Sequence, residues 1–504
     1  MTAEFFLANR PLWGVLISMA AAGLILLNDR RPLIRESITM LAAAGKFIIV
    51  LSMLPEVLAG KLVETVPWTA AAGISLHFKA DPLGLLFALL SSGLWIVTSV
   101  YNIGYMRAMR YGHETGYYAA FALCLSATMG IAFAANLLTF FIFYEILTIA
   151  TYPLVIHART DEAVAGGRKY LVYTLAAGQL LLLAIVGVQI MVPEAEFTPG
   201  GFLAGQAPPA LLGVLFILFM AGVGVKSAIM PLHGWLPTAM VAPTPVSALL
   251  HAVAVVKAGA FGVLRVVGYV FGPELINSTA SGKILVGFAA ATIILASLRA
   301  LAEDNLKRRL AYSTVGQLSY IVLGAGLATP LAFLGGIMHI VAHAFMKITL
   351  FFCAGAVYAT AHKERVSEIG GTGKEMPVTM AAFLLGSLGI AGIPFFAGFV
   401  SKWNLGLGAL EAGNIFVILV LIASALLSTG YLLPVAIQAF FGRSSGTHHG
   451  GEAKPSLLYP LVITACISII LGVFPNIGLK FYELALAAVQ SVFGATSSIA
   501  MGGQ

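Results

Sequence analysis

Four lysines and one glutamate lie inside long apolar stretches, where an ionised side chain is costly. Glu145 is the only acidic residue deep within such a run, NLLTFFIFYEILTIATYPLV. The lysines are Lys226, Lys257, Lys347 and Lys402. Desolvation disfavours the charged form of a lysine, and a nearby carboxylate favours it again. Groups of this kind can therefore take up and release protons.

Glu145 and Lys226 are the natural partners among these residues. Movement of the carboxylate toward the lysine would favour the ammonium, and movement away would release its proton. The alternative is a permanent ion pair that holds two helices together. Because packed apolar residues often replace such a pair without loss of stability, we favour the proton-transfer interpretation.

Three titratable groups share one face of the run GGIMHIVAHAFMKITLFFCAG. His339, His343 and Lys347 are spaced i, i+4 and i+8, and histidine suits proton relay because it titrates near neutrality. His251 is a further candidate, six positions before Lys257 and therefore on a different helical face. A single histidine here could equally satisfy a core hydrogen bond. The HxxxH spacing also fits zinc, but the run contains no carboxylate, so we predict a relay and no metal site.

In chain order the groups predict a polar line from Glu145 through Lys226 and Lys257 to the histidines, ending at Lys402. Such a line carries protons through water. Sodium needs several oxygen ligands, and only Glu145 offers a deep carboxylate. Ser313 and Tyr320 could hold waters between the lysines, or could merely satisfy helix contacts.

Helix-breaking residues interrupt two of the apolar runs beside a buried lysine. The run Val223–Ala252 is broken by prolines after Lys226, and Phe383–Gly406 contains four glycines and a proline before Lys402. Non-helical backbone inside a bilayer must face protein or a wet cavity, which makes broken helices frequent transport sites. We expect both breaks to lie at mid-membrane depth.

The composition is that of a polytopic membrane protein. Of 504 residues, 59% are hydrophobic and 10% are charged, whereas a soluble domain carries about 25% charged residues. The net charge of +7 comes from basic residues in short loops, so nucleic-acid binding is not indicated. The three cysteines lie in apolar runs and favour neither a metal site nor a disulfide. No NAD, flavin, quinone or iron–sulfur motif is present, so we predict no cofactor and no redox site on this chain.

About fourteen segments are long enough to span a bilayer, and the fold class is therefore all-α. They begin near Pro11, Thr39, Pro82, Tyr117, Asn136, Gly166, Pro209, Pro243, Lys283, Leu310, Leu331, Val378, Asn414 and Leu457. The breaks in segments seven and twelve, five segments apart, predict two inverted five-helix repeats. One domain would comprise helices 1–3 (residues 1–116), the repeats (117–275 and 283–441), and helix 14 with a tail (456–504).

Charged loops predict the orientation. Basic residues gather in the loops after odd-numbered segments, so both termini should face away from the cytoplasm. Lys46 and Arg265 lie near segment ends and could extend to the membrane surface. The amphipathic stretch Lys480–Val492 would lie along that surface.

The chain resembles the antiporter-like proton-channel subunits shared by Mrp cation/proton antiporters, respiratory complex I and membrane-bound hydrogenases. The resemblance covers segments two to fourteen and is carried by FYEILTIATYPLV, VKSAIMPLHGWLPTAMVAPTPVSALLHA, VVKAGAFGVLR, LKRRLAYSTVGQLSYI, HAFMKITLFFCAG and GIPFFAGFVSKW. It implies that Glu145 and Lys226 form the switching pair, that Lys257 is the connecting lysine and that Lys402 is the terminal residue.

Within the family, the resemblance favours the Mrp D subunit. The terminal position is glutamate in M-type subunits of complex I, so Lys402 argues against that type. The loop VSEIGGTGKEMP also looks like Mrp D, and no long lateral helix follows segment fourteen. The resemblance implies a bacterial or archaeal inner-membrane protein that moves H+, and possibly Na+, among other membrane subunits. Alternatives are a complex I or hydrogenase subunit and a stand-alone solute transporter.

Overall fold

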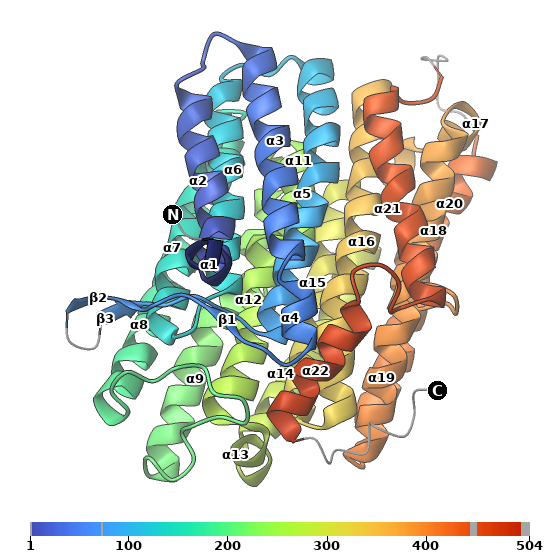
Figure 1. Ribbon diagram of the computed structural model, residues 1–504. Coiled ribbons are helices and arrows are strands. Elements are labelled where there is room, and N and C mark those ends of the chain that lie inside the picture. The colour runs from blue at the N-terminus through green and yellow to red at the C-terminus, as the bar shows by residue number, and fades with distance from the viewer. Residues whose placement is uncertain (1–2, 72–73, 444–450, 495–504) are drawn as a thin grey trace.

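The computed structural model describes residues 3–71, 74–443 and 451–494 as one bundle of helices (Figure 1). Within that part of the chain, twelve helical stretches are long and apolar enough to cross a membrane. They are α3 with α4 (Pro32–Leu51, Leu54–Leu58), α5 (Pro82–Met109), α6 (Glu114–Ala132), α7 (Leu137–Val155), α8 (Asp161–Met191), α9 (Pro209–Lys226), the stretch Thr244–Phe271, α14 (Ser281–Ala302), α15 (Leu306–Leu327), α16 (Pro330–Ala361), α20 (Ile415–Phe441) and α21 (Pro455–Val473).

Two further predicted segments correspond to shorter helices. Segment one is α2 (Arg10–Leu26), which follows the short α1 (Ala3–Ala8), and segment twelve is the broken pair α18 (Pro377–Ala391) and α19 (Ala397–Glu411). All fourteen predicted segments are therefore helical, and the all-α polytopic fold class is confirmed. The division into residues 1–116, 117–275, 283–441 and 456–504 stays a prediction, and residues 495–504 of that tail lie outside the described chain.

Short strands between α4 and α5 were not predicted. β1 (Val63–Glu64) pairs antiparallel with β4 (Lys79–Ala80), and β2 (Trp68–Ala71) pairs with β3 (Ile74–Leu76). This connection lies outside the apolar runs, so its backbone groups can pair locally at the end of the bundle. A search for spanning segments does not detect hairpins of this size.

The centre of the bundle is α16. Its apolar window is buried along its whole length, and it packs against α11, α15, α18, α19 and α21. A helix that is apolar around its circumference is expected inside the protein rather than against lipid. The titratable stripe of His339, His343 and Lys347 is therefore enclosed by other helices.

Both predicted breaks are present. The chain leaves the helix after Lys226 and resumes in the short α10 (Trp235–Thr238) and η1 (Ala239–Val241), and Trp235 Nε1 donates to the Val225 carbonyl at 2.8 Å. Between α18 and α19, Gly392 takes a left-handed φ of +88° that favours glycine. These two glycine- or proline-rich turns interrupt segments seven and twelve as expected.

A third break divides segment eight. Helix α11 (Thr244–Ala252) ends before α12 (Val255–Arg265), and the π-helix η2 (Val266–Phe271) continues α12. No glycine or proline lies at Val253–Ala254, so the sequence contains no signal for this break. His251 and Lys257 consequently belong to different helices.

Four short helices complete the fold, and two expectations require correction. The helices are α13 (Pro273–Ser278), η3 (Val366–Glu368), α17 (Thr372–Glu375) and α22 (Phe481–Phe493). Lys46 does not extend to the membrane surface, because its ammonium is buried, donates to the Leu125 carbonyl at 3.0 Å and lies 4.6 Å from the Trp95 ring centroid. Arg265 is likewise buried, in an ion pair with Asp81.

Candidate functional site

Lys226 and Glu145 occupy the first part of the predicted line. Lys226 is the last residue of α9 and is fully buried; its ammonium donates to the Tyr144 carbonyl and lies 3.4 Å from the Tyr144 ring centroid. The Glu145 carboxylate, on α7, is close enough to interact electrostatically with Lys226. Among the described residues, however, its two oxygens have no hydrogen-bond partner and no ion pair joins them to Lys226. The two groups are neighbours held apart.

Two glycines make room for this arrangement. A Cβ on Gly178 of α8 would lie 2.4 Å from Glu145 Oε1, so the carboxylate occupies the space that a side chain would fill. A Cβ on Gly259 of α12 would lie 2.3 Å from the Ser227 nitrogen. The close approach at Gly259 brings the helix that carries Lys257 against the end of α9.

The central group contains five fully buried titratable side chains. They are His251, Lys257, His339, His343 and Lys347, from α11, α12 and α16. Within the described chain, the Lys257 ammonium and both ring nitrogens of His251 and His343 have no hydrogen-bond partner. His343 interacts electrostatically with the other four members. The structure thus brings together residues separated by nearly a hundred positions in the sequence.

Lys347 is the exception in this group because it has partners. Its ammonium donates to Ser313 Oγ at 2.7 Å and to the Leu310 carbonyl at 3.4 Å. Ser313 in turn bonds to the Tyr431 hydroxyl at 2.9 Å. The predicted role of Ser313 in holding water stays a prediction, while its direct contact with Lys347 is observed.

The far end of the line lies at the broken segment twelve. His339 Nδ1 is 2.8 Å from Ser401 Oγ, and Ser401 immediately precedes Lys402. The Lys402 ammonium donates to the carbonyls of Ile390 and Ala391 at 2.6 and 3.2 Å, the last carbonyls of α18. A cation at a helix C-terminus is favoured by the helix dipole and by the unpaired carbonyls.

Lys402 also borders the outside of the bundle. It lines an open pocket of about 340 Å³ together with Gly392, Trp403 and residues of α20. The ring centroid of Tyr320 lies 5.0 Å from its ammonium on the inner side. Lys402 therefore faces both the central group and the lateral surface.

Sequence reasoning missed some of the contacts of these residues. The Tyr144 carbonyl and ring hold Lys226, yet a tyrosine beside Glu145 carries no special signal. Ser401 could have been noticed, since it adjoins Lys402 and faces the histidine stripe. Within the described residues, no three His, Cys, Asp or Glu side chains gather as a metal ion would require.

Comparisons with known proteins agree with this architecture. Residues 134–428 match the family described as NADH:quinone oxidoreductase/Mrp antiporter, transmembrane. The chain is 33% identical to NADH-quinone oxidoreductase subunit N of Desulforudis audaxviator, over 93% of this chain and 96% of that protein. It is 30% identical to a Na(+)/H(+) antiporter subunit of Alkalihalophilus pseudofirmus, over 88% of this chain and 58% of that longer protein.

Solved structures show the same fold. A chain in the Mrp complex of a Dietzia species matches with a TM-score of 0.87 and 21% identity, covering 99% of both chains. A chain in a membrane-bound sulfane sulfur reductase, an archaeal respiratory membrane complex, matches with a TM-score of 0.82 and 23% identity, covering 97% of both. The chain belongs to the NADH:quinone oxidoreductase/Mrp antiporter transmembrane family.

Proposed function

We propose that the chain is the proton-translocating subunit, of the Mrp D type, in a multisubunit monovalent cation (Na+)/H+ antiporter. The observation that carries the proposal is the set of buried bases on α9, α12, α16 and α19, each of which contacts the next helix. A buried polar group without a partner destabilises the folded state, by about 1–3 kcal/mol or more when charged. Several such groups in one cluster are better explained by proton transfer than by stability.

The proton path follows the geometry. When the Glu145 carboxylate approaches Lys226, the amine is favoured as an ammonium; when it withdraws, the ammonium gives its proton to water beside Lys257. Lys257, now an ammonium, passes the proton to a neutral imidazole in the central group. His339 lies next to Ser401, and the final acceptor is the neutral amine of Lys402. Each transfer leaves the donor neutral and ready for the next cycle.

The choice of complex rests on fewer observations. A lysine at position 402 and the loop VSEIGGTGKEMP support the Mrp D type. The subunit N relative, 33% identical over nearly the whole chain, supports the alternative of a proton-pumping subunit in a redox-driven complex. Both place the chain among other membrane subunits, in a bacterial or archaeal inner membrane with its termini on the non-cytoplasmic side.

The test of the function is Lys226→Ala in the intact complex, with Lys46→Ala as a matched control. Both lysines are fully buried, donate to a backbone carbonyl and lie over an aromatic ring. In proteoliposomes, Lys226→Ala should abolish coupled proton movement, whereas Lys46→Ala should retain it when assembly is equal. Unchanged proton movement in Lys226→Ala would refute the proposal.

A second experiment separates the two complexes. The tagged chain is purified from its native membrane and its partners are identified by mass spectrometry. Mrp-type assembly predicts small membrane subunits and proton movement driven by a sodium gradient. Co-purifying iron–sulfur subunits, with proton movement driven by electron transfer, would establish the alternative.

A further inference from the structure

A cavity opens on the side of the bundle that carries β1–β4 and α22. Its volume is about 390 Å³, and its lining includes Lys61, Lys79, Asp81, Tyr269 and Ser491. The Tyr269 hydroxyl is buried, faces Ser491 and has no hydrogen-bond partner among the described residues. The cavity is thus polar on several sides and contains a polar atom that a water molecule could satisfy.

An ion pair forms the floor of this cavity. The Asp81 carboxylate accepts hydrogen bonds from both terminal nitrogens of the buried Arg265, one of them at 2.7 Å, and from the Gly84 backbone at 2.7 Å. A Cβ on Gly84 would lie 2.3 Å from the Ala132 carbonyl and 3.0 Å from the Arg265 guanidinium. Glycine at this position therefore allows the guanidinium and the start of α5 to meet.

A stripe on one helix leads from the floor to the central group. Lys257, Phe261, Arg265 and Tyr269 recur every four residues along α12 and η2, spanning about 18 Å at the rise of an α-helix. Backbone nitrogens of Thr198 and Gly200 donate to the carbonyls of Tyr269 and Gly268, at 3.1 and 3.0 Å. Such π-turns are rare and frequently occur at functional sites.

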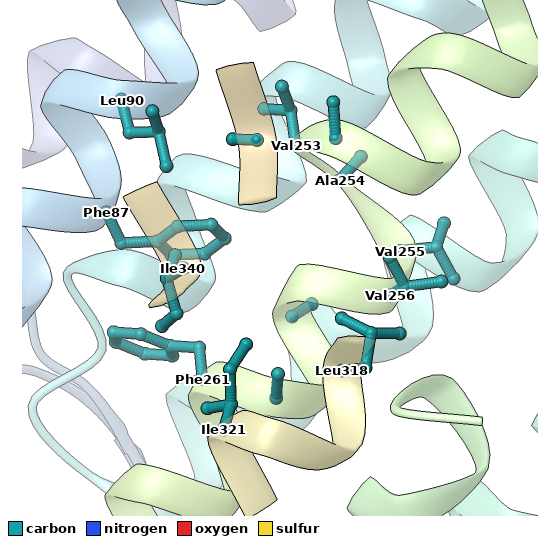
Figure 2. Close-up of a cluster of buried hydrophobic side chains, with 14 of the residues drawn as sticks. Phe87, Leu90, Val253, Ala254, Val255, Val256, Phe261, Leu318, Ile321 and Ile340 are labelled. Atoms are coloured by element: carbon teal, nitrogen blue, oxygen red, sulfur yellow. The ribbon is translucent and has the colours of Figure 1, made fainter. Parts of the chain in front are cut away.

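Only apolar side chains separate Arg265 from Lys257 along this stripe. Phe261 stacks on Phe87 of α5 with ring centroids 4.9 Å apart, and both rings are fully buried. Figure 2 shows these rings beside Ile340 of α16, the neighbour of His339. Apolar constrictions of this kind gate channels by excluding water.

We propose that the cavity is a proton port for Lys257, closed by the stacked rings of Phe87 and Phe261. The port rests on the proposed function, because Lys257 must carry a proton for the port to serve it. When water enters the constriction, the Lys257 ammonium donates its proton to that water and becomes a neutral amine. The proton then leaves along water that is hydrogen-bonded to Asp81 and Tyr269. Arg265 is a positioning residue that holds the carboxylate at the floor.

Thiol labelling tests the access route without measuring transport. In the intact complex with Cys466, the exposed native cysteine, replaced by serine, Ser491→Cys and Tyr269→Cys should react with a charged, membrane-impermeant thiol reagent from the α22 side only. Phe261→Cys should be protected and become reactive when Phe87→Ala is added. Failure of Tyr269→Cys to react, or protection of Phe261→Cys in the double variant, would overturn the port.

A leak assay tests whether the port leads to Lys257. Phe87→Ala should collapse an imposed pH gradient severalfold faster than the wild-type complex, while Phe383→Ala, an equally buried control in α18, should not. Adding Lys257→Met should remove the leak. A leak that persists without Lys257 would overturn the port but leave the proposed function intact; normal transport by Lys226→Ala would overturn the function without changing the labelling pattern.

Discussion

At the scale of residues, the buried cations fall into two classes. Lys46 and Arg265 have complete surroundings: a carbonyl and an aromatic ring for one, and a carboxylate for the other. Lys257 has no hydrogen-bond partner in the described chain, and neither do the imidazoles of His251 and His343. Partnered cations hold helices together, whereas groups without fixed partners can exchange protons with water and with each other.

The close contact between Glu145 and Gly178 gives the first prediction. Gly178→Ala places a methyl group 2.4 Å from Glu145 Oε1, so the carboxylate must move and its influence on Lys226 must change. We expect a clear loss of coupled proton movement in proteoliposomes that contain the assembled complex. Gly287→Ala in α14, where a Cβ meets nothing within 4 Å, is the control and should behave like wild type. Equal activity of the two variants would contradict the prediction.

At the scale of elements, the breaks place the lysines. The α9 break exposes the end of a helix beside Lys226, and the break between α18 and α19 supplies two free carbonyls to Lys402. Glycine and proline made both breaks predictable from the sequence. The break at Val253–Ala254 was not predictable, because no local residue demands it and only the packing of α11 and α12 against α16 accompanies it.

Close packing at the second break gives an element-scale prediction. A Cβ on Gly398 would lie 2.1 Å from the Gly389 carbonyl, so Gly398→Ala forces α19 away from α18. Overpacking of this kind costs about 1–3 kcal/mol. We expect a lower melting temperature of the purified complex and weaker transport. Gly406→Ala on the same helix has open space around the new methyl group and should be neutral or slightly stabilising.

The limits of sequence reasoning have the same physical origin. Buried charges and apolar runs identified the spanning helices and the titratable residues, because the bilayer punishes a charge wherever the rest of the fold lies. The burial of Lys46 and the separation of Glu145 from Lys226 depend on which helices pack together. Sequence periodicity contains no record of such tertiary contacts.

At the scale of the whole molecule, the titratable line crosses the bundle from α7 to α19. The line ends at Lys402 beside an open lateral pocket, and apolar residues such as Trp403 and Leu410 are exposed there, at 57% and 59%. Exposed apolar surface on a spanning helix contacts lipid or a neighbouring subunit. A proton line that reaches the lateral surface suits one member of a larger complex.

This architecture predicts that the chain depends on its partners. The purified single chain in liposomes should show neither solute transport nor cation-driven proton movement, whereas the complete complex should show the latter. The measurement is the pH change inside vesicles under an imposed sodium gradient. Solute uptake by the chain alone would instead identify a self-contained transporter.

Lys257→Met in the complete complex is the most direct test of proton transfer along the buried line. Lys257 has no hydrogen bond to lose within the described residues, and methionine is close to it in size, so packing should be preserved. We expect normal assembly with coupled proton movement reduced roughly 10²-fold, the lower end of what a positioned proton-transfer group contributes. Proton movement at the wild-type rate in Lys257→Met would contradict the account.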